Sequence, residues 1–278
     1  MTAVLLAVAS AALFGGMTVA IRIGLRSGEA HAAALATILS ALAVALVAAA
    51  IRPALDGAWP FLLAGLIAPG GSQILFTRAV QEAGASRTSV TVGAAPLVAV
   101  AIALVLLGEP VSAPLVLGAL AIVGGGVLLA AERDRPEHLR RIGLAYAAMA
   151  AVLFATRDNL VRALHGDATP ETAAAATLLA GAVLAAVWTR RAPSRVELAR
   201  FAPAGLLFGL SYLCLFAAYY HGRVTVVSPL VATESLFGVA FSALLLGRSE
   251  HVGARIVGGA LLIVAGGVLI AVVIGKGT

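Results

Sequence analysis

The chain has 278 residues, of which 61% are hydrophobic and only 12% are charged, and its mean hydropathy is +1.04. A soluble domain has about 25% charged and about 45–50% apolar residues, so this composition excludes a soluble globular protein. The formal net charge of +6 would suit a nucleic-acid-binding protein. The arginines, however, lie in short breaks between apolar runs rather than in one basic patch, so we expect no nucleic-acid partner.

The apolar runs fall into two groups of five. At about 20 residues per spanning helix plus short loops, a chain of this length has room for about ten spanning helices. In the first group we predict spanning helices over residues 3–21, 32–51, 59–79, 88–107 and 113–131. After the polar stretch 132–141, the second group covers residues 142–161, 172–188, 201–220, 225–246 and 252–274. The runs lack the polar–apolar alternation of barrel strands. The predicted fold is therefore an all-α transmembrane bundle of ten helices.

The loop charges predict an orientation for these helices. Most of the arginines, among them Arg78, Arg140 and Arg191, fall on one side of the predicted bundle. The positive-inside rule places that side in the cytoplasm. We therefore expect a multi-pass protein of a bacterial-type inner (plasma) membrane with both termini outside.

The two groups of runs also repeat one another in sequence. A shift of about 140 residues superposes side chains that rarely match by chance, namely Phe14 with Phe154, Arg22 with Arg162 and Phe76 with Phe216. Five spans per repeat is an odd number, so the second repeat enters the membrane in the opposite direction. We predict two inverted five-helix repeats, residues 1–131 and 142–278, joined by a cytoplasmic linker over 132–141. Inverted repeats are a device of secondary transporters; an inherited scaffold without transport is the alternative.

Several motifs link this pattern to a known family. The first repeat reads Ala-Ala-Pro-Leu at 94–97, Leu-Leu-Gly-Glu-Pro at 106–110 and Gly-Gly-Gly-Val at 124–127. The second repeat echoes them with Leu-Leu-Leu-Gly at 244–247, Glu250 and Gly-Gly-Ala-Leu at 258–261. The sequence resembles the drug/metabolite transporter superfamily, specifically its EamA-type ten-helix exporters. It departs from that pattern by having Glu234 where the first repeat has Pro96. The resemblance implies a transporter fold but leaves the substrate open.

Glu234 is the first candidate for a functional residue. It lies about ten residues into the ninth predicted helix, or roughly 15 Å from its start, which is close to the bilayer midplane. An ionisable side chain at that depth is costly and normally faces an interior cavity. We expect Glu234 to contact substrate or to carry a coupled proton; a structural pairing with an arginine is the alternative.

The sixth predicted helix has a second charged group, formed by Arg157, Asp158 and Asn159. Asp158 and Arg162 are four residues apart and can pair along one helix face. Arg162 also matches Arg22 of the first repeat, which favours a role as a helix-end anchor at the membrane interface. Arg157 is then left for Glu234 or for an anionic group of the substrate. The equivalent residues of the first repeat, at positions 17–19, are uncharged, which favours a functional role over a scaffold role.

Other candidates are polar residues or prolines within apolar runs. Tyr212 and Tyr219 replace Ser72 and Ala79 of the first repeat, and tyrosines can line a cavity for an amphipathic solute; packing or an interfacial aromatic belt is the alternative. Ser72 and Gln73 are expected to face the same space. We expect Pro96 and Pro229 to bend the fourth and ninth predicted helices, which would suit gating.

The functional prediction is a secondary active transporter that exports a small metabolite, amino acid or toxic organic compound by alternating access, driven by protons. A lipid-head-group flippase or an organophosphate exchanger of the same fold remains an alternative, and an intramembrane enzyme is an alternative of another class. We expect no catalytic residues, no metal site and no cofactor, and the chain has no phosphate-binding P-loop motif. The expected partners are a small-molecule substrate and membrane lipid, with a homodimer left open.

Overall fold

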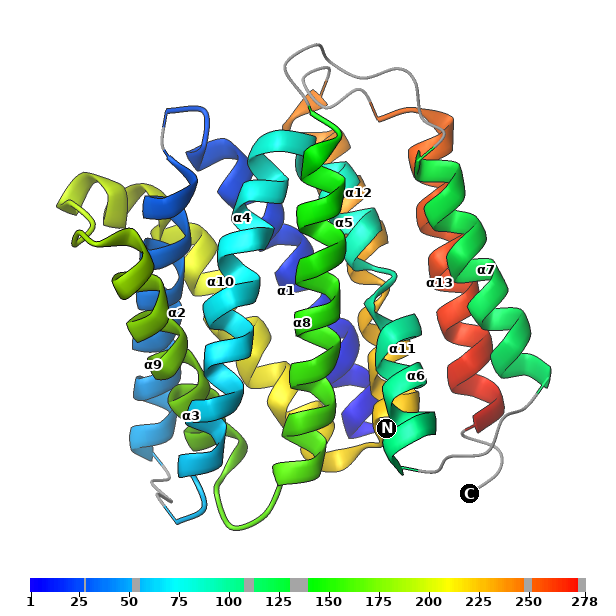
Figure 1. Ribbon diagram of the computed structural model, residues 1–278, viewed down its shortest axis with the longest axis horizontal. Helices are drawn as coiled ribbons and strands as arrows, with labels where there is room; N and C mark the ends of the chain where they lie inside the picture. The colour runs from blue at the N-terminus through cyan, green and yellow to red at the C-terminus, as the bar shows by residue number, and fades with distance from the viewer. Residues whose placement is uncertain (28, 52–55, 108–112, 131–139, 248–251, 275–278) are drawn as a thin grey trace.

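The computed structural model describes residues 1–27, 29–51, 56–107, 113–130, 140–247 and 252–274. The described residues form helices and connecting turns, without a strand among them (Figure 1). The all-helical class is therefore confirmed. The motif residues 108–110 and Glu250, together with linker residues 132–139, lie outside the described part of the chain.

The helices of the first repeat are α1 (Thr2–Gly24), α2 (Ala30–Ile51), α3 (Trp59–Gly65), the π-helical segment η1 (Leu66–Gly71), α4 (Ser72–Ala83), α5 (Ala85–Val92), α6 (Ala95–Leu107) and α7 (Ala113–Ala130). Those of the second repeat are α8 (Ile142–Leu164), α9 (Pro170–Thr189), α10 (Arg195–His221), α11 (Val224–Val231), α12 (Glu234–Leu245) and α13 (Ala254–Ile274). They lie on the predicted apolar runs. Within the described residues, seven helical stretches are long and apolar enough to cross a membrane.

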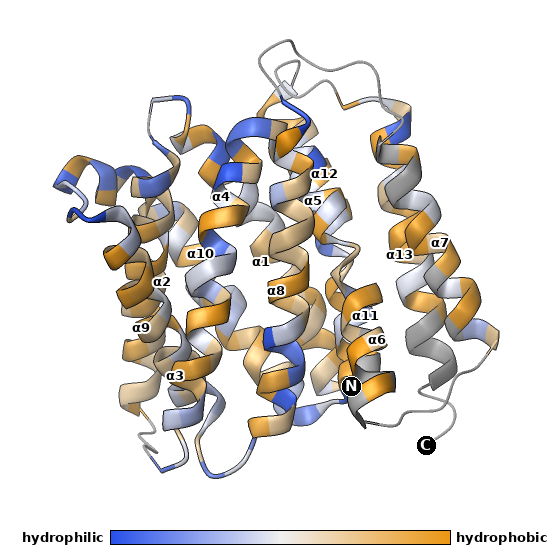
Figure 2. Cartoon of the chain, in the orientation of Figure 1, coloured by the Kyte–Doolittle hydropathy of each residue, from blue (hydrophilic) through white to orange (hydrophobic). Residues whose placement is uncertain are grey.

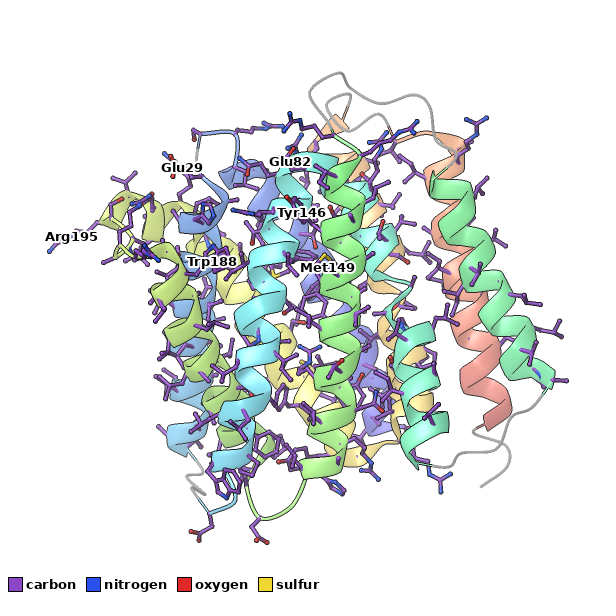
Figure 3. The ribbon with its side chains drawn as sticks, viewed as in Figure 1. Glu29, Glu82, Tyr146, Met149, Trp188 and Arg195 are labelled. Atoms are coloured by element: carbon purple, nitrogen blue, oxygen red, sulfur yellow. The ribbon has the colours of Figure 1, made fainter. Side chains whose placement is uncertain are left out.

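The bundle has two chemically different ends. Figure 1 shows the start of α1 and the end of α13 at the same end, which we call the terminal end. Glu29, Glu82 and Arg195 lie at the opposite end (Figure 3), and Arg140 and Arg191 pair with carboxylates there. We call this opposite end the arginine-rich end. Hydrophilic residues gather mainly there, whereas hydrophobic residues follow the helices between the two ends (Figure 2).

Small side chains allow the helices to pack closely inside the bundle. The buried core is rich in alanine, whereas large apolar side chains such as Leu5, Val47 and Leu244 point outward and are exposed. This distribution suits a protein whose outer surface meets lipid, because helices in membranes associate through small residues and close packing. Gly205 of α10 illustrates the closeness: a Cβ atom there would lie 2.2 Å from Cβ of Ser40 on α2.

Two of the predicted helices are broken near the middle of the bundle. One is divided into the short helices α5 and α6, and the other into α11 and α12. At the first break the Ala94 amide donates to the Thr91 carbonyl (3.2 Å), and at the second the Thr233 amide donates to the Leu230 carbonyl (3.1 Å). These bonds to the third preceding residue are 3₁₀ turns, which keep backbone groups bonded where water is scarce. The backbone therefore changes direction at each break while these amide and carbonyl groups remain hydrogen-bonded.

The two interrupted pairs lie side by side, with α5 against α12 and α6 against α11. Glycines make this contact possible. A Cβ atom at Gly93 would lie 2.7 Å from Cβ of Ser235, and one at Gly238 would lie 2.1 Å from Oγ of Ser89. The breaks of both repeats consequently meet in the interior, where the ends of four short helices converge.

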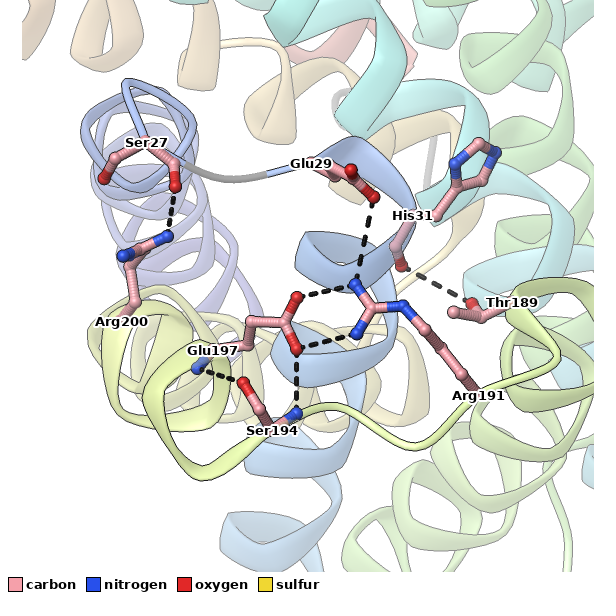
Figure 4. A network of polar contacts seen from close by, with 8 residues as sticks. All are labelled: Ser27, Glu29, His31, Thr189, Arg191, Ser194, Glu197 and Arg200. Atoms are coloured by element: carbon pink, nitrogen blue, oxygen red, sulfur yellow. Dashed lines mark hydrogen bonds and ion pairs between the residues drawn. The ribbon is translucent and has the colours of Figure 1, made fainter.

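A polar network ties the two repeats together at the arginine-rich end (Figure 4). Arg191 donates to both carboxylate oxygens of Glu197, at 3.0 and 2.7 Å, and lies 3.8 Å from a carboxylate oxygen of Glu29. Glu197 also completes a capping box with Ser194 at the start of α10. Arg200 donates to the carbonyl oxygen of Ser27. The turn before α2 is therefore held against the turn between α9 and α10.

Candidate substrate cavity

A small closed cavity lies where the interrupted helices meet α1, α8 and α10. Its volume is about 30 Å³. A water molecule needs about 10–15 Å³ on this measure, whereas pockets for organic ligands have about 300–1,000 Å³. The cavity therefore has room for about two waters, and a solute could enter only if the surrounding helices moved apart. Both repeats contribute to its wall, with Ser10, Phe14, Val92, Ala95 and Pro96 from the first and Phe154, Arg157, Asp158, Ser211, Tyr212, Leu215, Ser228, Val231, Ala232 and Glu234 from the second.

An ion pair between neighbouring residues of α8 forms one part of this wall. Arg157 Nε donates to Asp158 Oδ1 at 2.8 Å, and Arg157 Nη2 lies 2.7 Å from the same oxygen. The two side chains are only 5% and 6% exposed. Each charge therefore has its counter-charge beside it. A charge buried in a medium of low dielectric constant is strongly destabilising without such a partner.

The possible pairing of Asp158 with Arg162 is not formed. Arg162 Nη1 instead donates to the Tyr219 carbonyl at 3.1 Å, near the end of α10. The last carbonyls of a helix have no partner within that helix and attract a cation. Arg157 is long and flexible enough to fold back onto the adjacent carboxylate. It therefore takes Asp158 as its partner, in place of the Glu234 or substrate anion that we expected.

Aromatic rings enclose the guanidinium of Arg157. Its Cζ lies 4.9 Å from the ring centroid of Tyr212 and 5.3 Å from that of Phe154. These are cation–π distances. Arg157 Nη1 is buried and has no hydrogen bond to a described residue. One amino group of the guanidinium thus remains available in the closed cavity.

Asn159 belongs to the same helix but does not line the cavity. Its side-chain amide donates to the carbonyls of Ala99 (3.2 Å) and Ala155 (2.9 Å). Ala99 is on α6, so Asn159 joins α8 to one of the interrupted helices. This geometry fits a structural tie better than a substrate contact.

Glu234 begins α12 at the second helix break and lines the cavity. Glu234 is only 5% exposed. Among the described residues no hydrogen bond or ion pair reaches its carboxylate, although Arg157 and Asp158 are close enough to interact with it electrostatically. The start of a helix carries a partial positive charge, which favours a carboxylate by about 0.3–1 kcal/mol. That is small compared with the cost of leaving a carboxylate without a partner inside a membrane.

The other predicted residues divide into two groups. Tyr212 and Pro96 line the cavity, whereas Tyr219, Ser72, Gln73 and Pro229 are buried but absent from its wall. Tyr219 nevertheless lies near Asp158. Gln73 is fully buried, and neither its amide nitrogen nor its oxygen has a hydrogen bond to a described residue.

Our sequence reasoning missed a pair of serines at the cavity wall. Ser10 Oγ donates to the Ser211 carbonyl and Ser211 Oγ donates to the Ser10 carbonyl, both at 3.0 Å, and the two hydroxyl oxygens are 2.9 Å apart. This reciprocal contact fastens α1 to α10. The repeat itself held the signal, because the equivalent positions are Ala150 and Gly71.

The architecture defines a multi-pass integral membrane protein whose apolar helices enclose a charged cavity. The sequence matches the model of the EamA-like transporter family over residues 1–131 and 141–272, and the chain belongs to this family. The resemblance seen in the motifs is confirmed. The family is part of the drug/metabolite transporter superfamily, and its members are transporters rather than enzymes.

Structural comparison supports the same fold. One solved structure, titled only as the crystal structure of a protein, matches with a TM-score of 0.73 and 21% sequence identity. The match covers 99% of this chain and 98% of the other, and at this identity it shows the fold alone. No curated protein matches the sequence.

Proposed function

We propose that this protein is a proton-coupled secondary transporter that exports a small organic solute by alternating access. In this proposal the chain crosses a bacterial-type inner membrane ten times, as two inverted repeats, with both termini outside. The cavity between the two helix breaks is the substrate site in its closed form.

The observation that carries the proposal is the carboxylate of Glu234, which lines a small cavity and has no hydrogen bond or ion pair to a described residue. Arg157 and Asp158 neutralise each other, so an ionised Glu234 leaves one excess negative charge among the described residues of the cavity wall. A charged side chain near the bilayer centre costs at least about 2.5–3.5 kcal/mol. Binding a proton removes that charge, and so does binding a cationic group of a solute.

This charge balance supplies a coupling mechanism. If the closed cavity forms readily only when Glu234 is neutralised, the helices change access with a proton bound or with solute bound, but not with an empty carboxylate. A proton then enters from the outside and is released to the cytoplasm, and the solute moves in the opposite direction. The higher free energy of the closed form with an empty, ionised Glu234 couples the two movements, and the proton gradient drives the exchange.

The alternatives fit the cavity less well. A flippase or organophosphate exchanger needs several basic groups that converge on an anion. Arg157 is the one basic residue of the described cavity wall, and Asp158 already neutralises it. An intramembrane enzyme needs an activated nucleophile or a bound metal. Serines line the cavity, but its described wall has no histidine to activate them and no cysteine.

Proteoliposomes with a trapped pH indicator test the proposal. A panel of amino acids, amines and organic acids is applied, and proton movement is followed together with uptake of radiolabelled solute. We expect at least one solute to move protons, and Glu234→Gln to abolish this movement. Glu82→Gln, which changes a carboxylate at the arginine-rich end, is the matched control. Proton-coupled transport that continues unchanged in Glu234→Gln would refute the role of Glu234.

A further inference from the structure

An apolar groove lies on the outer side of the bundle, between α1, α10 and α12. Its volume is about 440 Å³, which is within the range of about 300–1,000 Å³ that pockets for organic ligands have. The described wall consists of apolar side chains and one glycine, and it shares no residue with the central cavity. The groove is therefore a second, separate space, and it faces the lipid rather than the interior of the bundle.

The groove has the length of the hydrocarbon region of one leaflet. At 1.5 Å per residue, the part of α1 that lines it spans roughly 16 Å, about half of the ~30 Å hydrocarbon core of a bilayer. A Cβ atom at Gly16 would lie 3.4 Å from Leu207 and 3.9 Å from the ring of Phe241, so this glycine leaves the floor of the groove open between α10 and α12. The shape suits one fatty acyl chain lying along α1. The residues of α1 in the wall are Ala12, Leu13, Gly16, Val19, Ala20 and Ile23.

The groove opens toward the arginine-rich end of the bundle. Ile23 precedes the last residue of α1, and Leu245 is the last residue of α12. These two side chains are 45% and 64% exposed. Both helices end at the arginine-rich end (Figure 1). An acyl chain in the groove would therefore have its methyl end near the middle of the bundle and its headgroup at the arginine-rich end.

Two arginines lie at this mouth of the groove. The Arg26 amide donates to the Ile23 carbonyl at 3.2 Å, so Arg26 follows Ile23 by one helical turn on the groove side of α1. Its side chain is exposed and has no hydrogen bond or ion pair to a described residue. Arg200 lies two turns before Leu207 on α10 and donates to the carbonyl oxygen of Ser27, the neighbour of Arg26 (Figure 4). Two guanidinium groups are thus available at the depth of a lipid phosphate, an anion that arginine binds strongly.

The carboxylates close to these arginines already have a partner. Glu197 precedes Arg200 by one turn of α10, and both of its oxygens accept hydrogen bonds from Arg191. Glu29 lies 3.8 Å from the same guanidinium. The described charges that remain at the mouth of the groove are therefore basic. A second copy of the chain would bring the same positive charges to this surface, which disfavours it as the occupant.

We propose that this groove binds one acidic phospholipid, with an acyl chain along α1 and the phosphate on Arg26 and Arg200. A headgroup with a net negative charge fits best, because the ammonium group of a zwitterionic lipid would meet the same two cations. The bound lipid fills the space between α1 and α12 and holds these two helices against each other from the outside. This partner is a component of the membrane and is independent of the solute in the central cavity.

Quenching of tryptophan fluorescence by brominated lipids tests the site. The chain has two tryptophans, so Trp59→Phe, Trp188→Phe and Phe241→Trp together leave one reporter, in the wall of the groove. The full-length protein is reconstituted in phosphatidylcholine bilayers, into which phosphatidylglycerol or phosphatidylcholine with brominated chains is titrated. We expect phosphatidylglycerol to occupy the groove at least about fivefold more strongly than phosphatidylcholine, and this preference to fall as the salt concentration rises. Equal quenching by the two lipids would overturn the inference.

Charge variants separate this site from the general positive charge of the surface. Arg26→Gln together with Arg200→Gln should remove most of the preference for phosphatidylglycerol. Arg195→Gln is the matched control, because Arg195 is exposed at the same end of the bundle and projects away from it (Figure 3). An equal loss of preference in the control would show that surface charge alone attracts the lipid, and would overturn the inference.

A second measurement needs no reporter and tests the acyl-chain contact. Native mass spectrometry of the protein, purified with phosphatidylglycerol added, should retain one lipid per chain. Ala20→Phe, which fills the groove, should lower the retained fraction at least about threefold. Ala176→Phe is its control, because Ala176 lines a different apolar groove, between α2, α3 and α9. Equal retention in Ala20→Phe and the parent would contradict the inference.

The same assays identify other occupants of the groove. Displacement of brominated phosphatidylglycerol by inorganic phosphate alone would mean that the arginines bind a free anion, and would overturn the lipid assignment. A reporter shielded from both brominated lipids, together with a dimer in the mass spectrum, would mean that a second copy covers the groove. Unfolding midpoints close to that of the parent show that each variant is folded.

Discussion

Phe14 and Phe154 occupy equivalent positions of the two repeats and touch each other edge to face, with ring centroids 5.7 Å apart and planes at 89°. Phe76 packs against both, at 5.1 and 6.0 Å. Along α1 and α8, the polar cavity residues Ser10 and Arg157 lie on the side of these rings that faces the terminal end (Figure 1). The three phenylalanines therefore separate the cavity from the arginine-rich end.

The first prediction concerns this aromatic contact. The double variant Phe14→Ala, Phe154→Ala should make liposomes leak protons without solute, because water could reach the cavity through the space left by the rings. The rate of collapse of an imposed pH gradient measures the leak. Phe61→Ala is the control, since Phe61 is equally buried but does not line the cavity. If the double variant leaks protons no faster than the parent, other residues form the barrier to water and protons.

The second prediction concerns the ion pair of Arg157 and Asp158. Asp158→Asn should destabilise the protein by about 3–5 kcal/mol, because it leaves a guanidinium buried without its counter-charge. Arg157→Gln together with Asp158→Asn removes both charges and should recover much of that loss. Reversible unfolding in detergent, analysed as a double-mutant cycle, measures the coupling. Additive losses would mean that the pair is not energetically coupled.

The third prediction concerns the contact between the interrupted helices. Gly238→Ala should destabilise the bundle by about 1–3 kcal/mol, because the new Cβ would lie 2.1 Å from Oγ of Ser89 and 2.5 Å from its Cβ. Gly124→Ala is the matched control, because a Cβ there meets nothing within 4 Å. Midpoints of thermal unfolding compare the two. Equal midpoints would show that α5 and α12 are not held as closely as the structure has them.

The fourth prediction concerns orientation. Cys214 is the one cysteine of the chain, so Cys214→Ser provides a background for single cysteines. In intact cells a membrane-impermeant thiol reagent should label Thr2→Cys, at the terminal end, but not Arg190→Cys, at the arginine-rich end. Permeabilised cells should show both sites labelled. The reverse pattern in intact cells would invert the proposed topology.

The sequence by itself determined the helical class, the family and the approximate helix positions. Hydropathy depends on local composition, so runs of apolar residues reveal spanning helices without any knowledge of their neighbours. The same reasoning selected Glu234, because an acidic residue within an apolar run is costly wherever the helix is packed. Comparison of the repeats then indicated Arg157, Asp158 and Tyr212, all of which line the cavity.

Only the tertiary structure decided which polar groups meet. Helical spacing favoured Asp158 with Arg162, but the end of α10 supplies a carbonyl for Arg162 and leaves Asp158 to Arg157. Tyr219, like Tyr212, replaces a small residue of the first repeat, and Gln73 was expected to face the same space. Both nevertheless lie outside the cavity wall. The reason is physical: hydropathy is a property of one segment, whereas a hydrogen bond, an ion pair or a cavity depends on which helices pack together and on the side chains that each neighbour presents.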